Sequence, residues 1–259
     1  MDTGEKGIII VFSGTGNSLA AAKTLSRELD LPLHMICGRE DKITDAHFDK
    51  LIFVVPSYAY GLPLPVKRFI KKSSFSADYT AAAVTCGSSA GGTLNSLKRM
   101  LKRRCVELNY GVDIQSVENF VPIFGRQSET KVEKRIKNQR ECTNAFAANI
   151  KSGQNNKIKG LHPVSIIVSS IFTAAQPVIA SMMRVRAKSC TKCGICAKAC
   201  PAEAIAIKRR KAKIKKLRCT ACQCCMNICP TNAITMLRKS AKTQSYINPD
   251  IEKSELIKR

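Results

Sequence analysis

The first 150 residues alternate between short apolar runs and longer segments in which apolar and polar positions recur at helical spacing. Apolar runs of strand length lie at residues 7–12, 33–36, 51–55 and 80–85. Helical spacing is found at residues 18–28, 65–72, 93–103 and 129–150. One further strand is expected between residues 106 and 123. The pattern therefore predicts strands and helices in alternation.

Alternating strands and helices are typical of the α/β class, in which helices cover both faces of a parallel sheet. In such doubly wound sheets, ligands bind at the carboxyl ends of the strands, near the point where the strand order reverses. Three loops rich in Gly and Ser follow three of the predicted strands. We therefore expect these loops to lie at the binding edge of the sheet.

The first of these loops, FSGTGNS at residues 12–18, resembles a phosphate-binding loop. It lacks the third glycine of a dinucleotide fingerprint and the lysine of a Walker A loop. What remains are hydroxyl groups and backbone N–H groups at a helix N-terminus, which can hold a phosphate monoester. No Lys or Arg lies between Gly7 and Ala22, so hydrogen bonds alone would bind the anion. The alternative is a Gly/Ser turn without a ligand.

The residues of this loop fit the flavodoxin pattern [ST]-x-T-G-x-[ST] at all six positions. The resemblance implies a flavodoxin-like sheet and FMN as the cofactor. It also implies that the loops at residues 56–63 and 85–92 contact the flavin ring, because glycine permits close backbone approach and tyrosine offers an aromatic face. Packing of the loop against the sheet is the alternative role for both tyrosines. The expected FMN-binding residues are Ser13, Thr15, Gly16, Asn17, Ser18, Pro56, Ser57, Tyr58, Tyr60, Gly61, Thr85, Cys86, Gly87, Gly91 and Gly92.

The cysteines change the picture for the rest of the chain. Nine of the 13 lie between Cys190 and Cys229. The chain begins without the basic and apolar segments of a secretion signal, so we expect a cytoplasmic protein in which clustered cysteines bind metal. The spacing C-x2-C-x2-C-x3-C-P occurs twice, from Cys190 and again from Cys219, and resembles two-cluster bacterial ferredoxins over about residues 186–237.

In the ferredoxin pattern, the fourth cysteine of each run ligates the other cluster. The resemblance therefore implies two [4Fe-4S] clusters. Their expected ligands are Cys190, Cys193, Cys196 and Cys229 for one cluster, and Cys219, Cys222, Cys225 and Cys200 for the other. A zinc site is the alternative, because C-x2-C pairs also form zinc ribbons. Cys224 lies between ligands and is interpreted as a bystander thiol, while the four scattered cysteines are interpreted as buried free thiols.

Together, the two parts resemble flavodoxin–ferredoxin fusions of bacteria and archaea. The resemblance implies electron transfer between FMN, two clusters and external redox partners, and we expect no catalytic acid or base. Two alternatives remain open: a flavin-dependent oxidoreductase acting on a small substrate or NAD(P)H, and a non-catalytic redox sensor. Because exposed low-potential clusters are oxygen-sensitive, we expect an anaerobic host. The expected parts are an FMN domain at 1–155, a connector at 156–185, a small α+β ferredoxin domain at 186–238 and a basic tail at 239–259.

The connector contains an uncharged stretch at residues 160–183. Its length would allow a membrane-spanning helix. Two prolines, a glutamine and several Ser and Thr residues argue against insertion, and basic residues on both sides give no topology. We therefore expect a helix that packs against one or both domains, with spanning or interfacial insertion as the alternative.

The formal net charge of +24 is concentrated in the C-terminal part. Residues 1–150 contain 21 Lys and Arg and 15 Asp and Glu, whereas residues 151–259 contain 22 and 4. A basic run, KRRKAKIKKLR, lies at residues 208–218 between the two cysteine motifs. It is interpreted either as a solvated face or as a docking patch for an acidic redox protein such as a ferredoxin or flavodoxin. Nucleic acid is not the expected partner, because no recognition fold or interleaved aromatic residues accompany the run.

Overall fold

The N-terminal part forms one five-stranded sheet. The computed structural model describes residues 6–120, 125, 127–158, 163–209, 211–236 and 245–257. All strand pairs in the sheet are parallel, in the order β2-β1-β3-β4-β5. The strands are β1 (Gly7–Val11), β2 (Leu33–Met35), β3 (Ala46–Pro56), β4 (Phe75–Cys86) and β5 (Tyr110–Gln115). This order, which reverses between β1 and β3, is the flavodoxin-like one.

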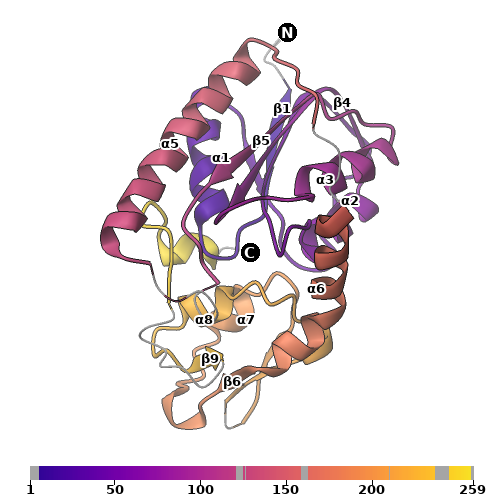
Figure 1. Ribbon diagram of the computed structural model, residues 1–259. Helices are drawn as coiled ribbons and strands as arrows, with labels where there is room; N and C mark the ends of the chain where they lie inside the picture. The colour runs from indigo at the N-terminus through magenta and orange to yellow at the C-terminus, as the bar shows by residue number, and fades with distance from the viewer. Residues whose placement is uncertain are drawn as a thin grey trace.

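Helices cover both faces of this sheet (Figure 1). They are α1 (Asn17–Leu29) and α5 (Glu129–Lys151) on one face, and α2 (Leu64–Lys72) and α3 (Thr93–Lys102) on the other. Alternate residues of the central strands enter opposite cores: Ile9 and Val11 pack with the α1 and α5 side, whereas Ile10 and Phe12 pack with the α2 and α3 side. The fold is therefore the doubly wound α/β class that the sequence predicts.

The predicted elements of this part are all present, with shifts at their ends. The strands β3 and β4 begin at Ala46 and Phe75, several residues before the apolar runs at 51–55 and 80–85. Their first residues are partly exposed and alternate in burial, so no continuous apolar run marks them. The fifth strand, expected between residues 106 and 123, is β5.

Helix α6 (Pro163–Ser181) follows the sheet and leads to the cysteine-rich part. Among the residues that the structure describes, no helix has the length and apolar character needed to cross a bilayer. The last turn of α6 is held by Lys216, whose Nζ donates to the carbonyl oxygens of Ala180 at 2.9 Å and Met183 at 3.0 Å. The helix thus packs against the cysteine-rich part at its C-terminal end.

The cysteine-rich part repeats one small unit. Each cysteine motif follows a strand and a short 3-10 turn, and each contains a short helix. The elements are β6 (Met183–Val185), η1 (Ala187–Ser189), α7 (Ile195–Lys198), β7 (Ile205–Ile207), β8 (Ala212–Ile214), η2 (Lys216–Arg218), α8 (Cys224–Ile228) and β9 (Ile234–Met236). β6 pairs with β9 and β7 pairs with β8, both antiparallel, around a separate core that includes Met226 and Ile234. This is a small α+β fold.

The chain end returns to the first domain. Residues 245–257, part of the segment expected to be a basic tail, lie beside α1 and α8 and end in the 3-10 turn η4 (Lys253–Leu256) (Figure 1). Ile251 and Leu256 are buried in the core on the α1 side of the sheet. This stretch is therefore a packed part of the fold.

Candidate functional site

The predicted phosphate loop runs from the end of β1 to the first turn of α1. The Ser13 hydroxyl accepts the N–H of Gly16 at 3.0 Å, and the hydroxyls of Ser18 and Thr85 lie 2.8 Å apart. Gly16 has a φ of 99°, which glycine adopts without strain. The N–H groups of the first turn of α1 have no partner within the helix and lie at its positive end. The loop therefore offers hydroxyl and N–H donors without a cationic side chain.

A small cavity of about 50 Å³, here called the inner cavity, opens beside this loop. It brings together most of the predicted FMN residues of the loops after β1, β3 and β4. Its lining is Ser13, Gly14, Thr15, Asn17, Ser18, Pro56, Ser57, Tyr58, Thr85, Cys86, Gly87, Ser116, Val117, Glu118 and Asn119. The three loops thus meet at the carboxyl edge of the sheet.

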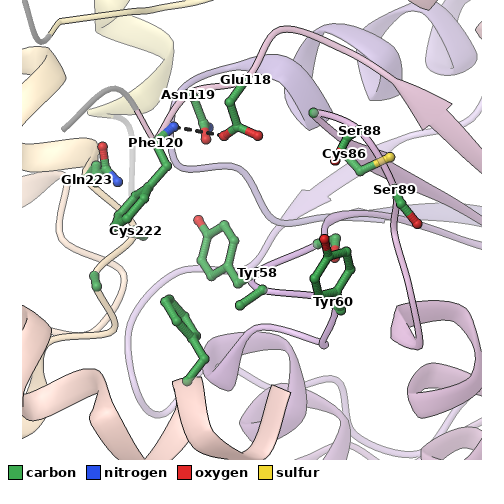
Figure 2. A pocket seen from close by; sticks show the side chains of 15 residues that line it. Tyr58, Tyr60, Cys86, Ser88, Ser89, Glu118, Asn119, Phe120, Cys222 and Gln223 are labelled. Atoms are coloured by element: carbon green, nitrogen blue, oxygen red, sulfur yellow. Dashed lines mark hydrogen bonds between the residues drawn. The ribbon is translucent and has the colours of Figure 1, made fainter. Parts of the chain in front are cut away.

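Figure 2 shows a larger cavity of about 280 Å³, here called the outer cavity. It shares six lining residues with the inner cavity: Ser57, Tyr58, Cys86, Gly87, Glu118 and Asn119. Four aromatic side chains line it, from three separate segments of the chain. Its full lining is Ser57, Tyr58, Ala59, Tyr60, Cys86, Gly87, Ser88, Ser89, Glu118, Asn119, Phe120, Phe172, Ala221, Cys222 and Gln223. The outer cavity is therefore walled by the sheet loops, by α6 and by a cysteine loop.

Four predicted glycines shape the loops instead of lining either cavity. Gly61 forms a bridge with Tyr58, and the N–H of Gly92 donates to the carbonyl of Tyr60 at 3.0 Å. Gly91 has a φ of 55°, and a Cβ there would lie 2.4 Å from the Cβ of Tyr60. Gly91 and Gly16, which both have a positive φ, permit turns that larger residues would strain.

The loop after β5, residues 116–120, was missed by the sequence analysis. It contributes Glu118, Asn119 and Phe120 to the outer cavity, and a Glu118 carboxylate oxygen accepts the N–H of Phe120 at 3.0 Å (Figure 2). The side chain of Asn119 donates to the Thr15 hydroxyl at 2.5 Å. Since the fifth strand was placed only within residues 106–123, the loop at its carboxyl end was not identified.

Of the four scattered cysteines interpreted as buried thiols, Cys86 is buried and lines both cavities, whereas Cys37 and Cys142 are partly exposed and Cys105 is exposed. Burial, followed by the nearby Asp113, raises the pKa of the Cys86 thiol to about 12. Its Sγ lies 3.9 Å from the carbonyl oxygen of Ile114. At neutral pH this side chain is thus a neutral thiol and part of the packing.

The eight predicted cluster cysteines divide into two groups in space. Cys190, Cys193, Cys196 and Cys229 line one small cavity, and Cys200, Cys219, Cys222 and Cys225 line another. These groups have the composition that cross-ligation between the two motifs implies. Cys224 lines the second cavity as well, but its side chain is 1% exposed and belongs to the core on the α1 side of the sheet.

The eight cysteines differ in burial: Cys196 and Cys225 are buried, Cys193 is exposed, and the other five are partly buried. Burial, followed by neighbouring cysteines, raises the pKa of Cys196 to about 11 and that of Cys222 and Cys225 well above the usual range of a thiol. Thiols in such surroundings form thiolates when a metal supplies the positive charge. The chemistry of this donor set fits iron–sulfur ligation.

The two candidate sites share a wall. Cys222 and Gln223 line the outer cavity, and a Cβ added at Gly14 in the phosphate loop would lie 2.5 Å from the carbonyl oxygen of Cys222. Gln223 Oε1 is buried, and the described residues offer it no hydrogen-bond partner. A ligand N–H group in the outer cavity would satisfy such an acceptor.

The first cysteine group lies at the surface beside the basic run. Cys193 and Lys192 are exposed, and Ile207 and Ala212 of the β7–β8 hairpin line the same cavity. The described residues of the run that are exposed include Lys208, Arg209, Lys213 and Lys215. The hairpin that lines the first cysteine group thus carries exposed positive charge.

Several solved structures are similar to about half of this chain. Flavodoxin 2 from Bacillus cereus is 18% identical, with 55% of this chain and 99% of that chain covered and a TM-score of 0.37. A flavoprotein in complex with FMN from Lactobacillus acidophilus NCFM is 11% identical, with 42% and 93% covered and a TM-score of 0.35. A flavodoxin from the domain Archaea is 12% identical, with 56% and 99% covered and a TM-score of 0.31.

A segment of the C-terminal part is matched by the profile of a protein family. No curated protein matches the chain. Residues 189–245 match the family profile of the 4Fe-4S dicluster domain. The chain therefore combines a flavodoxin-like domain with a ferredoxin-type 4Fe-4S dicluster domain.

Proposed function

We propose that this chain is an electron-transfer iron–sulfur flavoprotein of the flavodoxin–ferredoxin fusion type, with one FMN and two [4Fe-4S] clusters. The observation that carries the proposal is the shared wall: Cys222 and Gln223 line the same cavity as the loops after β3, β4 and β5. A cofactor in that cavity is in contact with a cysteine of the second group. Because the outer cavity and the second cysteine group share Cys222 and Gln223, transfer between their cofactors needs no diffusing carrier.

The chain's own residues account for how FMN would be held. Ser13, Thr15 and Ser18 supply hydroxyls to the phosphate, and the first turn of α1 supplies N–H donors and its positive dipole end. The aromatic rings of Tyr58 and Phe172 offer apolar surface to the flavin ring. When bound, FMN exchanges electrons singly or in pairs, whereas each cluster accepts one electron at a time.

The burial of the two cysteine groups supports an order for the cofactors. The second group adjoins the outer cavity through Cys222, and Cys225 is buried. The first group shares no lining residue with the outer cavity, and its Cys193 is exposed. We therefore assign the second cluster as the neighbour of the flavin and the first cluster as the exchange point with partners.

The charge around the first group supports an acidic protein as that partner. Lys192, Lys208 and Lys213 are exposed near the first group, and opposite charge raises the rate of encounter between proteins. A ferredoxin or flavodoxin with an acidic surface has the required chemistry. This interface is expected to weaken as salt is added.

The proposal is tested with full-length protein reconstituted under nitrogen. We expect about eight irons per chain and one flavin, released on heating as FMN. Protein that holds zinc in place of iron, or that fails to bind FMN, refutes the assignment of the cofactors.

The order is tested with Cys193→Ala, which removes one ligand from the first group. We expect this variant to lose about four irons and to slow flavin reduction by a reduced acidic ferredoxin, while dithionite still reduces the flavin. Flavin reduction by ferredoxin at the rate of the unaltered protein would contradict entry through the first cluster.

A further inference from the structure

The segment 245–257 is attached to the first domain by apolar and charged contacts. Leu256 is fully buried, and Ile251 is 6% exposed. Arg140 Nε donates to Asp250 at 3.0 Å, and Lys23 pairs with Glu255 at 2.6 Å. These contacts fix the position of the segment beside α1 and α5.

From this position the segment reaches the phosphate loop. The N–H of Asn248 donates to the carbonyl oxygen of Thr15 at 2.9 Å, and its side-chain amide donates to Asn17 Oδ1 at 3.1 Å. The Tyr246 hydroxyl donates to the same Asn17 oxygen at 2.8 Å. Asn248 is 0% exposed, and a Cβ at Gly16 would lie 3.0 Å from its Cβ. The segment therefore packs directly on the loop.

The side chain of Asn17 shows what these bonds do. Its amide nitrogen donates to the carbonyl of Val117 in the loop after β5 at 2.9 Å, and its oxygen accepts from Tyr246 and Asn248. Asn17, which was expected to contact FMN, lines the inner cavity, and its side chain also joins three backbone segments around it. Its position depends on the two donors from the chain end.

The same segment is tied to the second cysteine motif. The N–H of Tyr246 donates to Asn227 Oδ1 at 2.6 Å, and Asn227 donates in turn to the carbonyl of Gln223 at 2.9 Å. Gln223 follows Cys222 and lines the outer cavity. A continuous set of hydrogen bonds thus joins the phosphate loop to the cysteine loop through Tyr246.

We propose that Tyr246 and Asn248 are positioning residues for the phosphate loop, and that the chain end holds this loop against the second cysteine motif in the geometry that binds FMN. The proposal rests on the proposed FMN site. Burial raises the pKa of Tyr246 above its usual range, so its hydroxyl remains a donor throughout the neutral and moderately alkaline range. Removing the donors leaves the buried Asn17 oxygen unpaired, which favours other loop conformations.

Point variants of the full-length, cluster-loaded chain test this, because deleting the segment would expose core residues. Tyr246→Phe removes one donor to Asn17, and Tyr246→Phe with Asn248→Ala removes both. The matched control is Tyr79→Phe, which removes a 2.6 Å hydrogen bond to the carbonyl of Gln154 near the start of β4. The control also loses a tyrosine hydroxyl that donates a hydrogen bond, but at a position far from the carboxyl edge of the sheet.

Two measurements separate positioning from general stability. We expect FMN affinity to fall about fivefold in Tyr246→Phe and about 50-fold in the double variant, and to stay within twofold in Tyr79→Phe. Hydrogen exchange of residues 14–20, measured without flavin at unchanged iron content, should accelerate in the Tyr246 variants only. Unchanged FMN affinity and unchanged exchange in the double variant would overturn the inference.

The flavin-free measurement also distinguishes this inference from the proposed function. If the unaltered protein binds no FMN, the FMN site is refuted, and the phosphate loop is then not positioned for FMN binding. Faster hydrogen exchange in the Tyr246 variants would then still show that the segment 245–257 holds the phosphate loop in place. Faster exchange of the same size in Tyr79→Phe would instead indicate a general loss of stability and overturn the positioning role.

Discussion

The contact between the phosphate loop and the second cysteine motif is tested most directly at Gly14. A Cβ at this position would lie 2.5 Å from the carbonyl oxygen of Cys222 and 2.9 Å from the hydroxyl of Tyr58. The closest of these atoms is backbone, in a loop that also carries a proposed cluster ligand. Because ordinary contacts begin at 3.4 Å, Gly14→Ala requires the two loops to separate by about 0.9 Å.

The cost of that separation follows from its size. Inserting one carbon into a close-packed contact destabilises a protein by about 1–3 kcal/mol when backbone must move. If the loss falls on the contact between the domains, the docked arrangement becomes about 5- to 150-fold less favoured. In a chain of this size, each kcal/mol lowers the melting temperature by about 2–4 °C.

The assay compares Gly14→Ala with Gly111→Ala, whose Cβ would lie 3.1 Å from the end of the Leu94 side chain. That side chain can move, so the control should lose less than about 1 kcal/mol. We expect faster hydrogen exchange of residues 221–223 and weaker FMN binding in Gly14→Ala only. If Gly14→Ala keeps the exchange rates and the FMN affinity of the unaltered protein, the two loops are not in contact in solution and the shared wall is wrong.

Three further predictions concern the core, the buried thiol and the basic hairpin. Phe146→Ala should destabilise the first domain by about 3–5 kcal/mol, measured by urea unfolding, because Phe146 is 1% exposed; a loss below 1 kcal/mol would contradict its core position. At pH 8, iodoacetamide should modify the exposed Cys105 and leave Cys86 unmodified, as measured by mass spectrometry. Burial raises the pKa of Cys86 to about 12, so its thiol stays protonated at that pH. Equal labelling of both cysteines would contradict the burial of Cys86. The double variant Lys208→Glu with Lys213→Glu should associate with an acidic ferredoxin about tenfold more slowly at low salt and at an unchanged rate at high salt, as measured by stopped flow. Slower association that persists at high salt would argue against electrostatic steering.

The fold of the first domain could be predicted from the sequence, because the pattern of each central strand and helix agrees with the structure. The central strands are apolar on both faces, as strands buried between two helix layers must be. The strand ends were less accessible: Ala46 and Phe75 begin β3 and β4 in partly exposed surroundings, where polar residues conceal the strand pattern. The first residues of β3 and β4 pair with each other, which extends both strands beyond their apolar runs.

The candidate site could be predicted from the sequence only where a motif marks it. The phosphate loop and the cysteine motifs each require particular residues at fixed spacing, and few other kinds of site produce such a pattern. Phe120, Phe172 and Tyr246 carry no such signal, since a single aromatic residue in a loop, a helix or a chain end is compatible with many roles. They are brought to the site by tertiary packing, and no local pattern specifies that packing.

The position of the ferredoxin-type domain follows from the physics of the sheet edge. The carboxyl edge of a parallel sheet presents helix N-termini with unpaired N–H groups and loops without regular hydrogen bonding. A cofactor satisfies part of this edge, and here the second cysteine motif and the chain end cover another part through Cys222, Tyr246 and Asn248. The surface that binds the proposed flavin is thus also the surface that joins the domains. Because a ligand stabilises the state that binds it, FMN binding should strengthen the contact between the domains. By the same coupling free energy, FMN should bind more weakly when the domains are separated.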